Sequence, residues 1–132
     1  MNILYALRNN FLIIFCVLAA GCANGQGNRA LEVRAFSDSL KALPGAVLVD
    51  VRTPEEYTES HLLNAQNICW TCPDFEQEIV SIDKNNPVFV YCAVGGRSAQ
   101  AASKLRSMGY KKVYDLKGGI RAWHSQGMPE TR

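Results

Sequence analysis

Two continuous apolar runs constrain the fold of this 132-residue chain more than any other feature of its sequence. Residues 46–51 and 87–91 are rich in valine and show no alternation of polar and apolar positions. Such runs are typical of strands buried on both faces, which occur in parallel sheets that helices cover. Helical patterns separate and follow the two runs, as in βαβ units. The sequence therefore predicts an α/β fold, with helices on both faces of a mostly parallel central sheet.

Helix start and stop signals place the remaining elements. Thr53, Pro54 and Glu56 form the strongest start signal, because they can build a capping box with proline in the first helical position. Ser37 and Ser98 are the expected N-cap residues of two further helices. We expect short strands at residues 31–34, 64–68 and 112–116, and helices at residues 37–43, 53–60, 74–80, 98–108 and 120–126.

The first residues of the chain carry a targeting signal. Arg8 precedes an uninterrupted apolar run at residues 11–20, which is shorter than the ~20 residues that span a bilayer. This pattern favours a secretory signal peptide over a buried helix or an uncleaved anchor. Residues 18–22, which end in Cys22, resemble a bacterial lipoprotein signal. We expect removal of residues 1–21 and lipidation of Cys22; ordinary cleavage nearby, for example after Ala23, is the alternative.

The expected processing defines the domain organisation and the partners. Residues 22–30 would form a lipidated, flexible tether, and residues 31–132 a single domain. A diacylated cysteine satisfies the two-chain requirement for stable membrane anchoring. We therefore expect an exported monomer, held by its lipid at the periplasmic face of a bacterial membrane. The net charge of +2 and the lack of a basic run argue against a nucleic-acid partner.

The segment that follows the second apolar run carries the strongest chemical signal. Cys92 comes directly after the strand, and two glycines, an arginine and a serine follow it. Backbone N–H groups of such a loop, a helix N-terminus and a guanidinium favour a bound anion and a thiolate. A buried structural cysteine beside a glycine-rich turn is the alternative. We predict an anion-binding pocket with Cys92 as the catalytic nucleophile and a substrate-binding loop made of Ala93, Val94, Gly95, Gly96, Arg97 and Ser98.

Three segments together resemble a known family. Residues 92–98 resemble the active-site loop of rhodanese-domain sulfurtransferases. Residues 49–57, followed by His61, resemble the first signature of the family, and residues 115–123 resemble its closing one. The motifs occur in the family's order and cover about residues 31–128, so the chain is similar to an exported single-domain rhodanese. The resemblance implies a rhodanese-like three-layer fold.

The resemblance also implies an activity. Cys92 would take sulfane sulfur from a small-molecule donor such as thiosulfate and hold it as a persulfide. A thiophilic acceptor, either cyanide or a thiol, which can belong to a protein, would then receive it. Neither a cofactor nor a metal ion is expected. Related phosphatases and arsenate reductases have a loop one residue longer than Cys92–Arg97, so the loop length favours sulfur over a phosphate ester. Ala93 stands where some rhodaneses carry a cation, which makes thiosulfate a weak donor and leaves the physiological donor open.

Asp50 and Arg52 in the first signature admit two interpretations. They can support the active loop through hydrogen bonds, or they can form a structural ion pair, which we favour. His61 is expected to be a hydrogen-bonded structural residue. The glycines at 118 and 119 are expected to form a turn, with Trp123 as a core anchor.

The Cys69-Trp-Thr-Cys72 motif is not part of the general rhodanese pattern. A structural disulfide is the favoured interpretation, because an oxidising compartment joins nearby cysteines. The alternatives are a redox pair that resolves or accepts sulfur from Cys92 and a metal site, although zinc prefers a larger ligand set than this pair offers. Two other functions therefore remain open: a thiol–disulfide exchange protein centred on Cys69 and Cys72, and a non-catalytic sulfur-carrier module.

Overall fold

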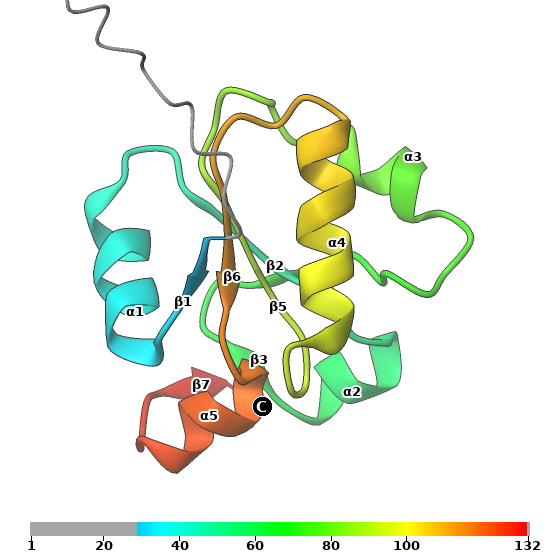
Figure 1. The fold of residues 1–132 in the computed structure, drawn as a ribbon. Helices are drawn as coiled ribbons and strands as arrows, with labels where there is room; N and C mark the ends of the chain where they lie inside the picture. Colours follow the sequence, from blue (N-terminus) through cyan, green and yellow to red (C-terminus); the bar gives the residue numbers. More distant parts are fainter. Residues whose placement is uncertain (1–28, 132) are drawn as a thin grey trace, which may run out of the picture.

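The computed structural model describes residues 29–131. The expected signal peptide and the lipidation site at Cys22 lie outside these residues. A five-stranded, fully parallel sheet forms the centre of the described part, in the order β1-β6-β5-β2-β4 (Figure 1). The predicted parallel sheet is confirmed. The strands are β1 (Ala30–Leu31), β2 (Val47–Asp50), β4 (Gln66–Asn67), β5 (Val88–Tyr91) and β6 (Val113–Leu116).

Helices cover both faces of this sheet, as the sequence predicts. One face packs against α1 (Val33–Ala42) and α5 (Gly119–Ser125), and the other against α3 (Phe75–Ile79) and α4 (Gly96–Ser107). The short helix α2 (Pro54–Glu59) follows β2 and contributes Tyr57 to the α1 and α5 side. Between residues 29 and 131, no helix has the length and hydrophobicity needed to cross a bilayer.

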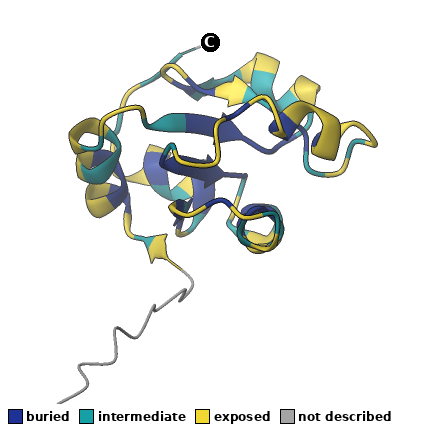
Figure 2. Cartoon of the chain, turned by 90° about the horizontal axis from the view of Figure 1, so that it is seen from above, coloured by how far each residue is buried: buried dark blue, intermediate teal, exposed yellow. Residues whose placement is uncertain are grey.

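The central strands are apolar because both of their faces are covered. All side chains of β5 are fully buried, and successive residues alternate between the two layers. Val90 faces Ala101 and Leu105 of α4, whereas Phe89 packs edge-on against Phe36 of α1 at a ring distance of 5.2 Å. Figure 2 shows the resulting pattern, in which buried residues gather in the sheet and on the inward sides of the helices. Burial of each such side chain contributes roughly 1.5–3 kcal/mol.

Two predicted helix starts are wrong. Helix α1 begins at Val33, so Ser37 lies inside it and is buried rather than capping it; Glu32 occupies the N-cap position without a side-chain cap bond. Helix α4 begins at Gly96, and Ser98 lies in its first turn. For α1 the reason is packing: Val33 and Phe36 bury their side chains against the sheet, and this outweighs the loss of a cap. For α4, Gly95 occupies the N-cap position in a left-handed conformation.

The N-terminus of α2 matches its prediction in detail. The N–H of Glu56 donates to Thr53 Oγ1 at 3.3 Å, and the N–H of Thr53 donates to Glu56 Oε2 at 3.0 Å. Both bonds of the expected capping box are therefore present, with Pro54 in the first turn.

A small antiparallel pair was not predicted. β3 (His61–Leu62) pairs with β7 (Glu130–Thr131), which ties the end of the described chain to the segment after α2. Two-residue strands carry no periodicity from which a sequence could reveal them. The same C-terminal segment is held by Trp123, whose Nε1–H donates to the carbonyl oxygen of Pro129 at 2.9 Å.

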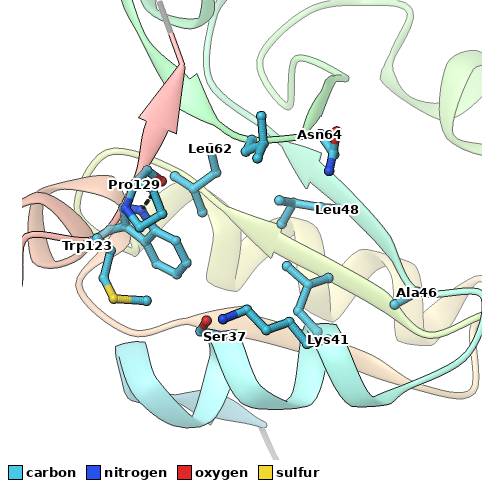
Figure 3. A pocket seen from close by; sticks show the side chains of 11 residues that line it. Ser37, Lys41, Ala46, Leu48, Leu62, Asn64, Trp123 and Pro129 are labelled. Atoms are coloured by element: carbon cyan, nitrogen blue, oxygen red, sulfur yellow. Dashed lines mark hydrogen bonds between the residues drawn. The ribbon is translucent and has the colours of Figure 1, made fainter.

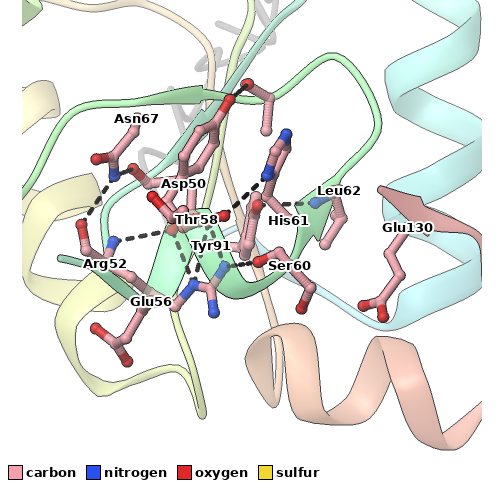
Figure 4. A network of polar contacts seen from close by, with 12 residues as sticks. Asp50, Arg52, Glu56, Thr58, Ser60, His61, Leu62, Asn67, Tyr91 and Glu130 are labelled. Atoms are coloured by element: carbon pink, nitrogen blue, oxygen red, sulfur yellow. Dashed lines mark hydrogen bonds and ion pairs between the residues drawn. The ribbon is translucent and has the colours of Figure 1, made fainter. Parts of the chain in front are cut away.

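A buried ion pair closes the carboxyl end of β2 (Figure 4). Arg52 contacts the Asp50 carboxylate through Nε and Nη2, with a closest distance of 2.6 Å. Arg52 Nη2 also donates to the carbonyl oxygen of Ser60 at 2.6 Å. The side chain of Asn67 donates to the carbonyl oxygens of Asp50 and Arg52. Arg52 thus joins the end of β2 to the end of α2, and Asn67 joins the same segment to β4.

The Tyr91 hydroxyl lies beside this pair and accepts the N–H of Leu62 at 3.0 Å. Burial, assisted by the negative charge of Asp50, raises the pKa of Tyr91 far above its ordinary value, so the phenol stays neutral. His61 ends the network, with Nδ1 at 2.9 Å from the Tyr57 carbonyl oxygen and its ring stacked on the Tyr57 ring.

We predict that Arg52→Met lowers the free energy of unfolding by about 3–5 kcal/mol, because it leaves the buried Asp50 carboxylate without its partner. Urea unfolding followed by circular dichroism measures the effect. The double variant Asp50→Leu/Arg52→Met removes both charges and should recover much of the loss. As a control, Lys104→Met breaks the more exposed pair with Glu76 and should cost less than about 1 kcal/mol. Equal costs for the two single variants would contradict the role assigned to burial.

Candidate active site

Cys92 begins a tight loop where β5 ends, in the middle of the parallel sheet. Its side chain is 1% exposed, and its sulfur is the free thiol among the described residues. The N–H of Gly95 donates to Cys92 Sγ at 3.1 Å. Gly95 has a φ of 109°, which an L side chain rarely adopts, so glycine suits this position in the turn that leads into α4. The sulfur therefore lies at the floor of the loop with a backbone donor directed at it.

Helix α5 braces this loop from the side. The N–H of Ile120 donates to the carbonyl oxygen of Cys92 at 2.8 Å, and the N–H of Arg121 donates to that of Ala93 at 3.1 Å. Gly119 makes this approach possible, because a Cβ there would lie 2.5 Å from the carbonyl groups of Cys92 and Ala93. The predicted Gly118–Gly119 turn is thus a support for the candidate active site as well as a turn.

Glu56 holds the far end of the loop. Both terminal nitrogens of Arg97 donate to the Glu56 carboxylate, at 2.7 and 2.8 Å. The hydrogen bonds from Arg97, helped by the backbone N–H of Thr53, lower the pKa of Glu56 to about 2. The same contact raises the pKa of Arg97. The positive charge that the sequence suggested for anion binding is therefore balanced by a carboxylate, and the backbone supplies the donor seen at the sulfur.

Sequence reasoning missed this role of Glu56 because it assigned the residue only to the capping box. The carboxylate serves both purposes: Oε2 accepts the N–H of Thr53 and a nitrogen of Arg97. The two partners are 41 residues apart in the chain, so spacing alone gives no signal of the pairing. The position of Glu56 within a family signature was the available clue.

The other predicted loop residues differ in exposure. Val94 is 55% exposed and forms the outer rim of the loop together with Gly96. Ala93 is half-buried under α5. Ser98 is fully buried in the first turn of α4, and its hydroxyl donates to the carbonyl oxygen of Gly95 at 3.3 Å. Ser98 therefore stabilises the loop from inside and is not accessible to a ligand at the rim.

Asp50 and Arg52 bind each other, as in the ion-pair interpretation. Both carboxylate oxygens of Asp50 accept hydrogen bonds from Arg52, and none of the described loop residues 92–98 donates to them. Their connection to the loop runs through the backbone: the N–H of Val51 donates to the carbonyl oxygen of Tyr91, one residue before Cys92, at 3.0 Å.

Cys69 and Cys72 are joined by a disulfide with a Cα–Cα distance of 5.3 Å. Cys69 is buried and Cys72 is half-buried. Trp70 between them donates from Nε1 to Gln100 of α4 at 3.1 Å and from its backbone to Val51 at 3.0 Å. Residues 29–131 contain no group of three His, Cys, Asp or Glu side chains placed for a metal ion. The motif therefore fastens the segment after β4 against α4.

Together these contacts define a chemical environment. The buried Cys92 sulfur accepts a hydrogen bond from a backbone N–H. The loop that follows it is held by α5 on one side and by Glu56 on the other. Fixed dipoles directed at sulfur stabilise negative charge there better than mobile water would. The arrangement suits a nucleophilic sulfur that attacks a small substrate and carries a group covalently.

Comparison with known proteins agrees with this geometry. The Rhodanese-like domain model matches residues 30–126. The thiosulfate sulfurtransferase GlpE of Tolumonas auensis is 37% identical over 86 residues, which cover 64% of this chain and 78% of that protein. A sulfurtransferase of Allochromatium vinosum is 32% identical over 99 residues, or 75% of this chain and 91% of that protein. The uncharacterized protein YqhL of Bacillus subtilis is 40% identical over 78 residues, which span 60% of its length.

A solved structure shares the fold. The crystal structure of a rhodanese-related protein from Thermoplasma volcanium superimposes with a TM-score of 0.69 at 26% identity, covering 78% of this chain and 97% of that one. The family model spans nearly all the described residues, including β5, the Cys92 loop and the whole of α5. This chain belongs to the rhodanese-like domain family.

Proposed function

We propose that this protein is a sulfurtransferase that carries sulfane sulfur on Cys92. The observation that carries the proposal is the enclosed Cys92 sulfur with the Gly95 N–H directed at it. Relatives named thiosulfate sulfurtransferase, such as the Tolumonas auensis protein at 37% identity, support the reaction class.

The reaction has two covalent half-reactions. The Cys92 thiolate attacks the outer sulfur of a donor such as thiosulfate; the donor's S–S bond breaks and sulfite leaves with the bonding electrons. A cyanide ion or a thiolate then attacks the outer sulfur of the persulfide, and the Cys92 thiolate leaves. No general base is needed once the thiolate has formed. Ping-pong kinetics follow from this scheme, and the Gly95 N–H stabilises the anionic sulfur in both halves.

The balanced charge of the loop bears on the choice of donor. Arg97 is paired with Glu56, and Ala93 supplies no cation beside Cys92. A dianionic donor therefore gains little Coulomb attraction here, whereas a donor of lower charge loses less solvation on entry. We accordingly place thiosulfate among the weak donors, with a small thiol or a thiol-bearing protein as the acceptor.

The proposed location follows from the N-terminal sequence. The apolar run at residues 11–20 and the small residues before Cys22 support export and lipid attachment at the periplasmic face of a bacterial membrane. In that setting the domain, working as a monomer, would meet donors and acceptors close to the membrane surface.

A second function, thiol–disulfide exchange, is favoured by one observation. The Cys69–Cys72 disulfide exists, and Cys72 is partly accessible. This alternative requires a disulfide reductase activity that survives Cys92→Ser and disappears in Cys69→Ser.

We predict that reduced wild-type protein gains one sulfur atom when it is exposed to thiosulfate or to glutathione persulfide. The gain, measured by intact mass, should be absent in Cys92→Ser because no other described thiol lies in the loop. The Cys69→Ser/Cys72→Ser variant is the control and should keep the gain. A sulfur atom added to Cys92→Ser, or none added to wild type by either donor, would overturn the proposal.

We predict that Ala93→Lys raises kcat/KM for thiosulfate about tenfold, because a charge-assisted contact to the dianion contributes roughly 1.5–3 kcal/mol. Ala93→Met is the matched control, since it adds similar length without charge. The gain should shrink as ionic strength rises. An equal change in both variants would show that size, and not charge, limits the donor.

We predict that Gly119→Ala lowers kcat/KM at least about tenfold while the fold persists, because the new Cβ displaces the carbonyl groups that begin the loop. Gly127→Ala is the matched control: its φ of 65° resembles the 61° of Gly119, but a Cβ there meets nothing within 4 Å. Both variants carry similar backbone strain, so only loop displacement separates their activities. Equal losses in steady-state sulfur transfer would contradict the bracing role of α5.

A further inference from the structure

A separate cavity lies on the opposite face of the sheet from α4 (Figure 3). It opens between α1, the start of β2 and the segment that runs from α5 to β7, and its volume is about 380 Å³. Cys92 packs within the other core cluster, on the α3 and α4 side. The size falls at the lower end of the range of small-molecule sites, roughly 300–1,000 Å³.

The walls of this cavity are apolar and fixed. Leu48, Leu62 and Trp123 are buried core residues that also line it. The Trp123 indole is held by its bond to the Pro129 carbonyl oxygen, and Leu62 is held by the pairing of β3 with β7. A ligand that enters therefore meets a preformed surface and does not have to order it.

Two polar groups of α1 face this apolar space. Ser37 and Lys41 are one helical turn apart and lie on the same side of the helix. In Figure 3 the Lys41 side chain runs along the cavity with its nitrogen toward Ser37. Ser37 is 3% exposed, and within residues 29–131 its hydroxyl has no hydrogen-bond partner. Lys41 forms no ion pair with a described residue, and none of the described residues lining the cavity is acidic.

We propose that this cavity binds a small amphipathic carboxylate, with its hydrocarbon chain against Leu48, Leu62 and Trp123 and its carboxylate at Ser37 and Lys41. The two polar groups supply donors, and the nearby charge is positive, so an anionic head complements them. Each methylene buried against the walls strengthens binding about fourfold. The site is independent of the sulfur chemistry at Cys92.

Tryptophan fluorescence tests the proposal on the full chain. The chain has two tryptophans, so Trp70→Phe leaves Trp123 as its reporter in the cavity wall. Octanoate should produce a saturable change. Hexanoate should bind about sixteenfold more weakly because it buries two fewer methylenes, and propionate should give no saturable signal. Octanol should bind about tenfold more weakly than octanoate, because it lacks the charge.

Variants locate the site. Lys41→Gln should weaken the binding of octanoate about tenfold and leave the binding of octanol unchanged. Lys111→Gln is the control and should change neither affinity, because Lys111 bonds to Asn85 away from the cavity. Ala46→Phe fills part of the cavity and should abolish the binding of octanoate and of octanol. A midpoint of urea unfolding near that of the parent protein shows that this variant folds. Absence of saturable binding by octanoate would overturn the proposal. Three other results would also overturn it. These are equal affinities for octanoate and octanol, an octanoate affinity that Lys41→Gln does not change, and octanoate binding by a folded Ala46→Phe variant.

Discussion

The burial of β5 between β2 and β6 is the constraint on which the candidate active site depends. All four side chains of β5 are inaccessible to solvent, and both neighbours run parallel to it. The carboxyl ends of the three strands therefore meet at one edge of the sheet, where ligands of such folds bind. Cys92 follows β5 there, Arg52 follows β2 and Gly119 follows β6. Three connections far apart in sequence thus meet at the Cys92 loop, which Glu56 after β2 and the first turn of α5 after β6 both contact.

The charged side chains described at this edge of the sheet pair with one another, so their charge stabilises the fold and is not free to attract a substrate. Glu56 caps α2 and at the same time pairs with Arg97, and Asp50 is fully engaged by Arg52. Each cation near the end of β2 and at the end of the loop therefore has its own carboxylate. The Gly95 N–H remains as the dipole directed at the sulfur. Such a site would stabilise the negative charge of the proposed persulfide through local dipoles rather than through net charge.

The elements that the sequence predicted correctly are those governed by local rules. The valine-rich strands at β2 and β5 and the capping box of α2 depend on neighbouring residues. Cys92 is a candidate for the same local reason, because it follows a buried strand directly, and its catalytic role stays a prediction. The start of α1 was misplaced because Val33 and Phe36 gain more from contact with the sheet than Ser37 gains from capping. The close approach of Gly119 to the carbonyl groups of Cys92 and Ala93 depends on where two distant segments meet, which no local pattern encodes.

Helix α5 contacts both the Cys92 loop and the apolar cavity, so a test that separates the two regions needs substitutions outside this helix. Its first turn donates to the carbonyl oxygens of Cys92 and Ala93, and Trp123, one turn later, forms a wall of the apolar cavity. A substitution in α5 would therefore disturb the loop and the cavity together. Lys41 and Ala46 reach the cavity from α1 and from the start of β2, the end of that strand farthest from Cys92. Changes at these two positions alter the cavity while the contacts that brace the loop stay intact, so ligand binding and sulfur transfer can be separated on one molecule.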